Sequence, residues 1–589
     1  MNVVAVLGSF IAALIITAPT VATDDCFKED RKFMPSDLLC SFSFPGRVLE
    51  AVTRRTEIRK TPVFLLLFFN AQLMQGLAAI SITAFTLRSI AFDKALASQS
   101  VALPVAVEPQ SSKSICPAQL GAAIDSVINR PQFRRARWGI LVEPLSPQQS
   151  DRTSTVNQNH ALYRHDAERY FIPASNVKLL TTAAALHQLG SEFRIRTSVY
   201  VSQAVAPNVA SASASSLRVV GRGDPSLTDV QLRELAQQLK RQGVRNVQQL
   251  VVDDGYFQGD AVNLSWEWED LQADYGASVN SLILNQNAVE VTLSPQKPGQ
   301  ALRVSWADAI AARQWRIEND SVTAEAAAPA SVTVTGVLGQ PVLRIKGQLA
   351  VDAEPESFGL AILDPAEYFL QHFRSVLATE GISVGRASVV SKDGTAGERE
   401  LAAVESPPLS VLLVEINQES NNLYAEALLR SLKASVKRSL SAGANSDSTD
   451  IGLNEMKATL TALGVNPESY VLADGSGLSR KNLVSPEAIA QTLKLMAQTP
   501  RASVYRASLP TAGVSGSLQH RFLNTTAQGN LHAKTGTLSG VSALSGYLDV
   551  PGYQPLVVSI MVNQSDQSTT TLRQAIDEIL VLLTRLGSC

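Results

Sequence analysis

The spacing of hydrophobic and polar residues divides the chain into three zones. Up to about residue 196, and again from about residue 405, apolar residues recur at helical spacing beside short apolar runs typical of buried strands. Between residues 197 and 404, short alternating stretches are separated by turn signals such as 221–225, which predicts mostly strands with few helices. The pattern therefore predicts an α+β protein with a large β-rich segment in its middle.

Individual elements follow from the same pattern. Helices are predicted over 119–128, 179–189, 409–416, 422–432, 452–463, 486–497 and 570–586. Strands are predicted over 137–142, 196–201, 217–220, 250–252, 289–293, 332–337, 342–349, 542–550 and 555–562. The Ala/Ser-rich residues 204–216 and 323–331 predict surface loops. We expect a helix-and-antiparallel-sheet body in two pieces, 116–196 and 405–589, interrupted by a β-rich insertion over 197–404.

The first hundred residues indicate export. Residues 61–87 are apolar and uncharged, follow a basic stretch at 54–60, and precede Ala95-Leu96-Ala97, which suits signal peptidase. The same segment is long enough to span a bilayer as an anchor, which would associate the protein with a membrane. We therefore expect a targeting region over 1–97, a linker over 98–115, and a location in the periplasm or cell envelope. Whether 61–87 is cleaved, and whether 1–60 belongs to the protein, stays open.

Composition narrows the function classes. A net charge of −2 gives no basic field for nucleic acid, and no Gly-rich phosphate loop follows a strand. The cysteines Cys26, Cys40, Cys116 and Cys589 form no C-x-x-C pair, so no thiolate metal site is expected. Cys116 and Cys589 bracket the main part of the chain, and they are either two unrelated thiols or a disulfide of an exported protein.

A Ser-x-x-Lys tetrad stands at the head of the apolar helix predicted over 179–189. Ser175 and Lys178 share a helix face, and a partly desolvated lysine can act as the base that a serine nucleophile needs. A second tetrad begins at Ser294 and ends at Lys297. It lies between two strand-like runs and precedes a proline, so it is interpreted as a hairpin turn.

Two later motifs complete a set of three. Ser420 and Asn422 form a Ser-x-Asn motif before a predicted helix, and Lys534-Thr535-Gly536 stands in a stretch that suits an edge strand. Because no G-x-S-x-G occurs and no histidine has a distinctive context, a Ser-His-Asp hydrolase has little support.

The order of the three motifs is that of penicillin-interacting serine acyltransferases. Together with the stretches 221–227, 252–257 and 474–480, it resembles the low-molecular-mass class C (type-4) penicillin-binding proteins, the D-alanyl-D-alanine carboxypeptidase/endopeptidases. The resemblance covers about residues 115–588. It implies a serine β-lactamase/transpeptidase-like fold, peptidoglycan stem peptides and β-lactam antibiotics as partners, and neither cofactor nor metal.

The resemblance also implies roles for the first two motifs. Ser175 would attack the carbonyl of the D-Ala-D-Ala bond to form an acyl-enzyme, and Lys178 would take its proton. Ser420 would pass a proton to the leaving amine, and Asn422 would orient the substrate and Lys178. Which lysine or serine is the base in each half-reaction stays open.

The third motif is implied to bind the substrate. Lys534 would attract the terminal carboxylate with help from the Thr535 hydroxyl, in the motif that Gly536 completes. The backbone N–H groups of Ser175 and Thr537 would form the oxyanion hole.

One segment of the insertion adds a candidate binding residue. In the family a Trp/Asp segment similar to Trp266-Glu267-Trp268-Glu269-Asp270 recognises the amino-bearing side chain of the stem peptide, a role that would fall to Asp270. The alternative is a solvated acidic loop anchored by two tryptophans.

Three functions remain to be distinguished. The first is a serine-type D-Ala-D-Ala carboxypeptidase or DD-endopeptidase, the second a β-lactamase of the same superfamily, and the third a non-catalytic wall-binding protein. The balance of carboxypeptidase and endopeptidase activity stays open, as does the oligomeric state.

Overall fold

The computed structural model describes residues 114–145, 161–202, 213–391, 397–435 and 447–587. The predicted targeting region 1–97, its apolar segment 61–87 and most of the predicted linker lie outside these residues. Within the described ranges, no helix is both long and apolar enough to cross a bilayer. Cys116 is disulfide-bonded, and the three other cysteines, Cys589 among them, lie outside the described residues.

Strands from both ends of the described chain form one antiparallel sheet in the order β16-β17-β18-β1-β2. Their bounds are β1 Arg137–Pro144, β2 Tyr163–His165, β16 Leu531–Leu538, β17 Val541–Leu548 and β18 Leu556–Asn563. The first and last pieces of the chain are therefore joined through β1 and β18. The strand that carries the Lys-Thr-Gly motif, β16, stands at the edge, as the sequence predicts.

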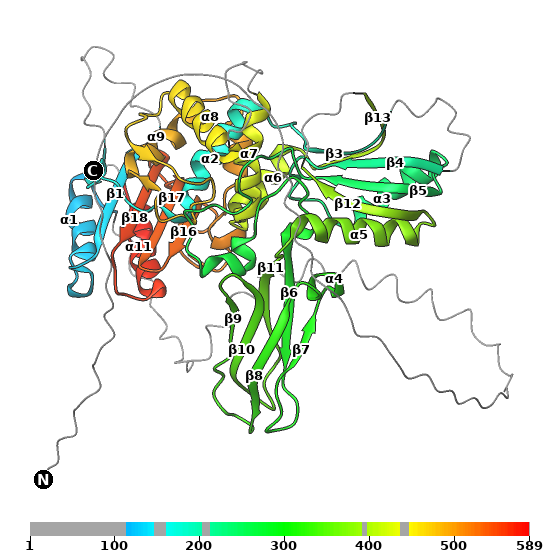
Figure 1. Ribbon diagram of the computed structural model, residues 1–589. Helices are drawn as coiled ribbons and strands as arrows, with labels where there is room; N and C mark the ends of the chain where they lie inside the picture. Colours follow the sequence, from blue (N-terminus) through cyan, green and yellow to red (C-terminus); the bar gives the residue numbers. More distant parts are fainter. Residues whose placement is uncertain (1–113, 146–160, 203–212, 392–396, 436–446, 588–589) are drawn as a thin grey trace, which may run out of the picture. The chain divides into compact units, whose positions relative to one another are not determined.

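Helices cover both faces of this sheet. α1 (Pro117–Ile128) and α11 (Thr569–Leu583) pack on one face. The other face borders a helical group made of α2 (Val177–Leu189), α6 (Leu409–Gln418), α7 (Asn422–Ser431), α8 (Ser448–Leu463), α9 (Pro486–Ala497) and α10 (Ala502–Ala507). Adjacent residues of β1 point to opposite cores, Ile140 to the first and Leu141 to the second, because side chains alternate along a strand. Figure 1 shows the sheet between these layers.

The middle of the chain forms three further sheets around a separate core. A mixed sheet, β12-β5-β4-β3-β13, consists of β3 Arg196–Ser202, β4 Ser213–Val220, β5 Asn246–Asp253, β12 Ser383–Val390 and β13 Glu398–Glu405. It packs with α3 (Asp229–Arg241) and α5 (Pro365–Thr379) (Figure 1).

Two three-stranded sheets complete the region, β11-β6-β7 and β8-β10-β9. Their bounds are β6 Ala288–Ser294, β7 Arg303–Trp306, β8 Arg316–Ala324, β9 Thr333–Val337, β10 Gln340–Ala350 and β11 Glu356–Ala361, with the short helix α4 at Ala309–Ala312. The short strands β14 (Tyr470–Val471) and β15 (Leu483–Val484) pair near the first sheet's helices.

The two surface loops predicted over 204–216 and 323–331 are wrong at one edge each. Residues 213–216 belong to β4 and residues 323–324 end β8, although both stretches are rich in small residues typical of loops. β4 pairs with strands on both sides and the end of β8 pairs with β10, so ladder hydrogen bonding outweighs composition. The hairpin interpretation of the second Ser-x-x-Lys is confirmed, because Ser294 ends β6 and Lys297 lies before its antiparallel partner β7.

Candidate active site

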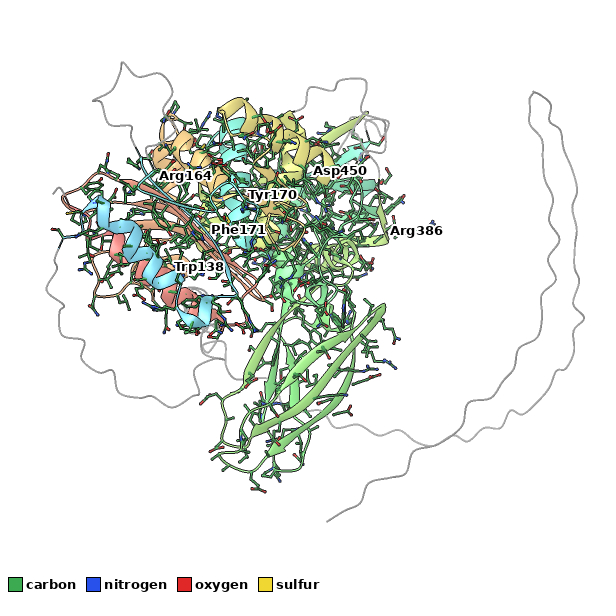
Figure 2. All side chains as sticks on the ribbon, turned by 90° about the vertical axis from the view of Figure 1, so that its left-hand side faces the viewer. Trp138, Arg164, Tyr170, Phe171, Arg386 and Asp450 are labelled. Carbon is green, nitrogen blue, oxygen red and sulfur yellow. The ribbon has the colours of Figure 1, made fainter. Side chains whose placement is uncertain are left out.

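The chain that leads to Ser175 is fixed on both sides. Phe171 exchanges backbone hydrogen bonds of 3.0 and 2.9 Å with Val484. The Asn563 side chain accepts from Ile172 N at 2.7 Å and donates to Ile172 O at 3.0 Å. Phe171, labelled in Figure 2, lies against Gly139 of β1, where any Cβ would overlap the ring. These contacts fix the segment that leads to Ser175 between β15 and the first sheet.

Ser175 lies in a single 3₁₀ turn, Ala174–Asn176, that continues into α2 at Val177. Ala174 adopts a left-handed conformation with φ of 49°, which turns the chain sharply into the helix. The sequence places Ser175 on the helix itself, whereas the structure places it one turn earlier. The predicted contact with Lys178 is nevertheless made, because a 3₁₀ turn also brings residues i and i+3 together.

Lys178 is fully buried and donates three hydrogen bonds. Its Nζ lies 2.9 Å from Ser175 Oγ, 2.6 Å from Asn422 Oδ1 and 2.7 Å from the Ser476 carbonyl oxygen. Burial lowers the pKa of Lys178 to about 7, although the negative charges of Asp474 and Glu426 oppose this shift. A neutral amine 2.9 Å from a hydroxyl can accept its proton.

A loop from 474 to 482 supplies the carbonyl that Lys178 contacts. Buried Glu426 of α7 accepts from Gly475 N at 2.9 Å and Ser476 N at 2.8 Å. Buried Asp474 accepts from Gly477 N at 2.8 Å and from Asn482 Nδ2 at 2.7 Å. Two carboxylates thus hold this loop, and their charges lie beside the Lys178 ammonium.

Gly477 brings the same loop against the 3₁₀ turn that carries Ser175. It has φ of +87°, and a Cβ at this position would overlap the carbonyl oxygen of Ala174. Only glycine combines this backbone conformation with such a close approach.

The Ser-x-Asn motif lies where α6 ends and α7 begins. Ser420 has φ of 61°, and its Oγ accepts a hydrogen bond of 2.9 Å from Lys534 Nζ. Asn421 caps α7 by accepting from Tyr424 N at 3.2 Å. Asn422, the first residue of α7, points to Lys178 on one side and donates from Nδ2 to the Tyr275 carbonyl on the other, at 2.9 Å.

The third motif lies on the edge strand β16, directly beside the 3₁₀ turn that carries Ser175. Asn176 Nδ2 donates to the Lys534 carbonyl at 3.2 Å, and a Cβ on Gly536 would lie 2.7 Å from the Pro173 carbonyl oxygen. Gly536 therefore allows the strand to approach the turn closely. Lys534 is fully buried, and burial together with repulsion from Lys178 lowers its pKa well below the usual value.

The remaining predicted residues of this strand lie toward solvent. Thr535 is half-buried and shares a hydrogen bond of 2.8 Å with Ser517. Thr537 is exposed, and Arg573 donates to its hydroxyl at 3.4 Å. β16 is the edge strand of the sheet, and Thr535 and Thr537 lie on it toward solvent.

Asp270 is linked to the second motif through one residue, Tyr275. Tyr275 OH donates to Asp270 Oδ1 at 3.1 Å, and the carbonyl of Tyr275 accepts from Asn422. Trp266, earlier in the segment, donates from its indole to Asp474 at 3.0 Å. Burial raises the pKa of Asp270, although the hydrogen bond from Tyr275 opposes this shift.

Sequence comparison agrees with this arrangement. The profile of the D-Ala-D-Ala carboxypeptidase 3 (S13) family matches residues 120–583, which is most of the chain. The chain belongs to the S13 family. It is therefore a serine-type peptidase of the D-alanyl-D-alanine carboxypeptidase class, and the resemblance found in the sequence is confirmed.

Individual S13 relatives cover most of the chain. A D-alanyl-D-alanine carboxypeptidase from Actinomadura sp. (strain R39) is 32% identical over 471 residues, 77% of this chain and 82% of its own. A penicillin-sensitive carboxypeptidase A from Dictyostelium discoideum is 28% identical over 476 residues, 76% of this chain and 87% of its own.

The predicted fold class is confirmed by a solved structure. The crystal structure of penicillin binding protein 4 from Haemophilus influenzae matches with a TM-score of 0.66 at 24% identity, covering 78% of this chain and 98% of that one. At this identity the match establishes the α+β fold with its inserted region.

Several residues of this S13 site were not assigned a role from sequence. They are Glu426, Asp474, Ser476, Tyr275 and Ser517, which contact the motif residues or hold the loop that does. A signal existed for Glu426, since it follows Asn422 by four residues and is the one acidic residue of a largely apolar helix. No group of three or more His, Cys, Asp or Glu side chains among the described residues could hold a metal ion.

Proposed function

We propose that Ser175 is the nucleophile and Lys178 its base. Ser175 Oγ attacks the carbonyl carbon of the D-Ala-D-Ala bond while its proton passes to the neutral Lys178 amine. The observation that carries this assignment is the 2.9 Å contact between Lys178 Nζ and Ser175 Oγ, made by a buried lysine whose pKa is lowered to about 7.

Ser420 is proposed to deliver a proton to the departing D-Ala amine. Its hydroxyl accepts from Lys534 at 2.9 Å, so its own proton is directed away from that lysine. Breaking of the C–N bond leaves an ester on Ser175 and releases D-Ala with the proton from Ser420, and the proton that Lys178 took from Ser175 then passes to Ser420. Water attacks the ester and gives a proton to Lys178, which is neutral again, and Lys178 passes this proton to Ser175 Oγ as the ester C–O bond breaks, which restores the Ser175 hydroxyl.

Lys534 and Thr535 are proposed to bind the terminal carboxylate of the substrate, and the backbone N–H groups of Ser175 and Thr537 to bind the oxyanion. Burial and Lys178 both disfavour charge on Lys534. An incoming carboxylate reverses this balance, because an opposite charge nearby favours the protonated amine.

Asp270 is proposed to meet an ammonium group of the stem peptide. Its link through Tyr275 to Asn422 supports a place beside the catalytic groups. We further propose that the protein acts on peptidoglycan in the cell envelope and that penicillins acylate Ser175. The disulfide at Cys116 supports an oxidising compartment. If residues 61–87 are not cleaved, they would in addition anchor the protein to the membrane.

Release of D-Ala from a synthetic peptide ending in D-Ala-D-Ala tests the assignment. We expect Ser175→Ala to lower kcat by a factor of about 1,000 or more, since a nucleophile is lost. Ser294→Ala, which removes the serine of the second Ser-x-x-Lys, should keep wild-type kcat. Equal activity of Ser175→Ala and wild type would overturn the proposal.

Digestion of purified muropeptides then separates the two activities that the class includes. Loss of terminal D-Ala indicates carboxypeptidase action, and cleavage of cross-linked dimers indicates endopeptidase action. Loss of both in Ser175→Ala is expected, because one acyl-enzyme serves both reactions.

A further inference from the structure

Three consecutive residues of the inserted region adopt a left-handed conformation. Asn285, Gln286 and Asn287 have φ angles of 49°, 59° and 49°. Asparagine tolerates this region better than other residues with side chains, but a glutamine between two such residues is unusual. Conformations of this kind persist only where the surroundings fix them, and they gather at functional sites.

The two outer residues are fastened to the inserted region. Asn285 Nδ2 donates to Asp229 Oδ2 at 3.0 Å and lies 3.3 Å from the Tyr368 hydroxyl. Asn287 Nδ2 donates to the Ser278 carbonyl at 2.9 Å, and Asn287 itself is fully buried. These side chains therefore supply the contacts that hold the strained backbone.

The surroundings of Asp229 make this anchorage rigid. The two ring nitrogens of His372 on α5 lie 2.8 Å from Asp229 Oδ1 and 2.8 Å from Asp308 Oδ2. Burial alone would lower the pKa of His372, but the two adjacent carboxylates, Asp229 and Asp308, raise it to about 9. Asn285 is thus tied to an ion-paired cluster that spans α3, α4 and α5.

The middle residue points out of the insertion to the second catalytic motif. Gln286 Oε1 accepts a hydrogen bond of 2.8 Å from Asn421 Nδ2. Asn421 is the central residue of Ser-x-Asn. Its Oδ1 caps α7 through Tyr424 N, and its Nδ2 also donates to Glu415 Oε1 at 3.2 Å. Gln286 therefore helps to hold the orientation of the residue between Ser420 and Asn422.

We propose that Gln286 is a positioning residue for the Ser-x-Asn motif, an inference that rests on the proposed function of that motif. By holding Asn421, it keeps Ser420 Oγ at Lys534 and Asn422 Oδ1 at Lys178. Ser420 has φ of 61° and so is itself in a left-handed conformation that needs support from its neighbours.

A second contact from the insertion also holds the Ser-x-Asn motif. The Tyr275 carbonyl accepts from Asn422 Nδ2 at 2.9 Å, so two successive motif residues are held by the inserted region. The insertion is accordingly part of the catalytic apparatus rather than a separate module attached to it.

The test uses Gln286→Met, which keeps the length of the side chain but removes its acceptor. We expect kcat for D-Ala release to fall about three- to tenfold, as for loss of one hydrogen bond, while KM and the thermal unfolding midpoint stay unchanged. Gln300→Met is the matched control. Gln300 is an exposed glutamine of the same inserted region, and its described contacts are through the backbone. It should behave as wild type.

A double-mutant cycle separates positioning from general destabilisation. If Gln286 acts through Asn421, then Gln286→Met in an Asn421→Ala background should lower kcat by less than about twofold. The inference would be overturned if Gln286→Met had the kcat of the wild type. It would also be overturned if Gln286→Met lowered kcat as much in the Asn421→Ala background as it does in the wild type. Both results leave the dependence of wild-type activity on Ser175 untouched, so failure here is distinguishable from failure of the proposed function.

Discussion

In the proposed mechanism, Lys178 is the residue on which the chemistry depends, because its charge decides whether Ser175 can be deprotonated. Its ammonium form is disfavoured by complete burial and favoured by Asp474 and Glu426, and burial prevails to bring the pKa to about 7. The Asn422 and Ser476 oxygens lie 2.6 and 2.7 Å from Nζ, which keeps the amine aimed at Ser175 in either protonation state.

The rate of acylation should therefore rise with pH. Below a pH of about 7 the lysine is protonated and cannot accept the serine proton, whereas above it the neutral amine predominates. Stopped-flow measurement of penicillin acylation between about pH 5 and pH 9 should show a rising limb centred near 7.

Lys178→Arg provides the control for this profile. A guanidinium stays charged throughout the range, so acylation should be about 100-fold slower or worse at every pH. A rate that does not change between pH 5 and 8 in the wild type would contradict the role of Lys178 as base.

At the scale of elements, the site depends on a loop pressed against a turn. Gly477 of the 474–482 loop lies against the Ala174 carbonyl. Gly536 of β16 lies against the Pro173 carbonyl, whose oxygen would be 2.7 Å from a Cβ placed on Gly536. The turn that carries Ser175 therefore lies between two backbone segments whose glycines allow them to approach it closely.

Gly477→Ala should impair catalysis more than folding. Its new methyl group would displace Ala174 and with it Ser175, and a displacement of about 1 Å lowers rates on the order of 100-fold. Gly529→Ala is the matched control, since Gly529 has φ of +74° but nothing within 4 Å of its ideal Cβ. Both variants should lose about 1 kcal/mol of stability from the left-handed backbone, and Gly477→Ala should lose more because its methyl group must displace the Ala174 backbone. Equal penicillin acylation by the two variants would contradict this account.

The motif-bearing elements could be predicted from sequence because each has a strong local signal. The apolar stretch after Lys178, the helix after Asn422 and the edge strand around Lys534 are found where expected. The helices α3 and α5 were not predicted individually, although Thr228 with Gln231 forms a capping box and Pro365 follows the N-cap Asp364. These helix-start signals were outweighed by the alternating apolar and polar residues around them, which indicate strands.

At the scale of the whole molecule, the proposed site is assembled from residues far apart in sequence. Ser175 precedes the inserted region, whereas Ser420 and Lys534 follow it, and the pairing of β1 with β18 brings the two pieces into one sheet. Near the ends of the described chain, Ile115 N donates to the Arg585 carbonyl at 2.7 Å, close to the disulfide-bonded Cys116.

Those long-range contacts explain what sequence alone could not provide. The supporting roles of Glu426 and Asp474 depend on a loop that meets Lys178 only in the folded chain. The contact between Gln286 and Asn421 joins residues 135 positions apart and has no local pattern. The motifs could be recognised by residue type and order, but the groups that orient them could not.

The most direct test of the assembled site is the position at which a penicillin becomes covalently bound. After reaction with a fluorescent penicillin, peptide mapping by mass spectrometry should find a single adduct on Ser175. Ser175→Ala should stay unlabelled, and Ser294→Ala should label as wild type. An adduct on another residue, or equal labelling of Ser175→Ala and wild type, would contradict the central claim that the three motifs form one site around Ser175.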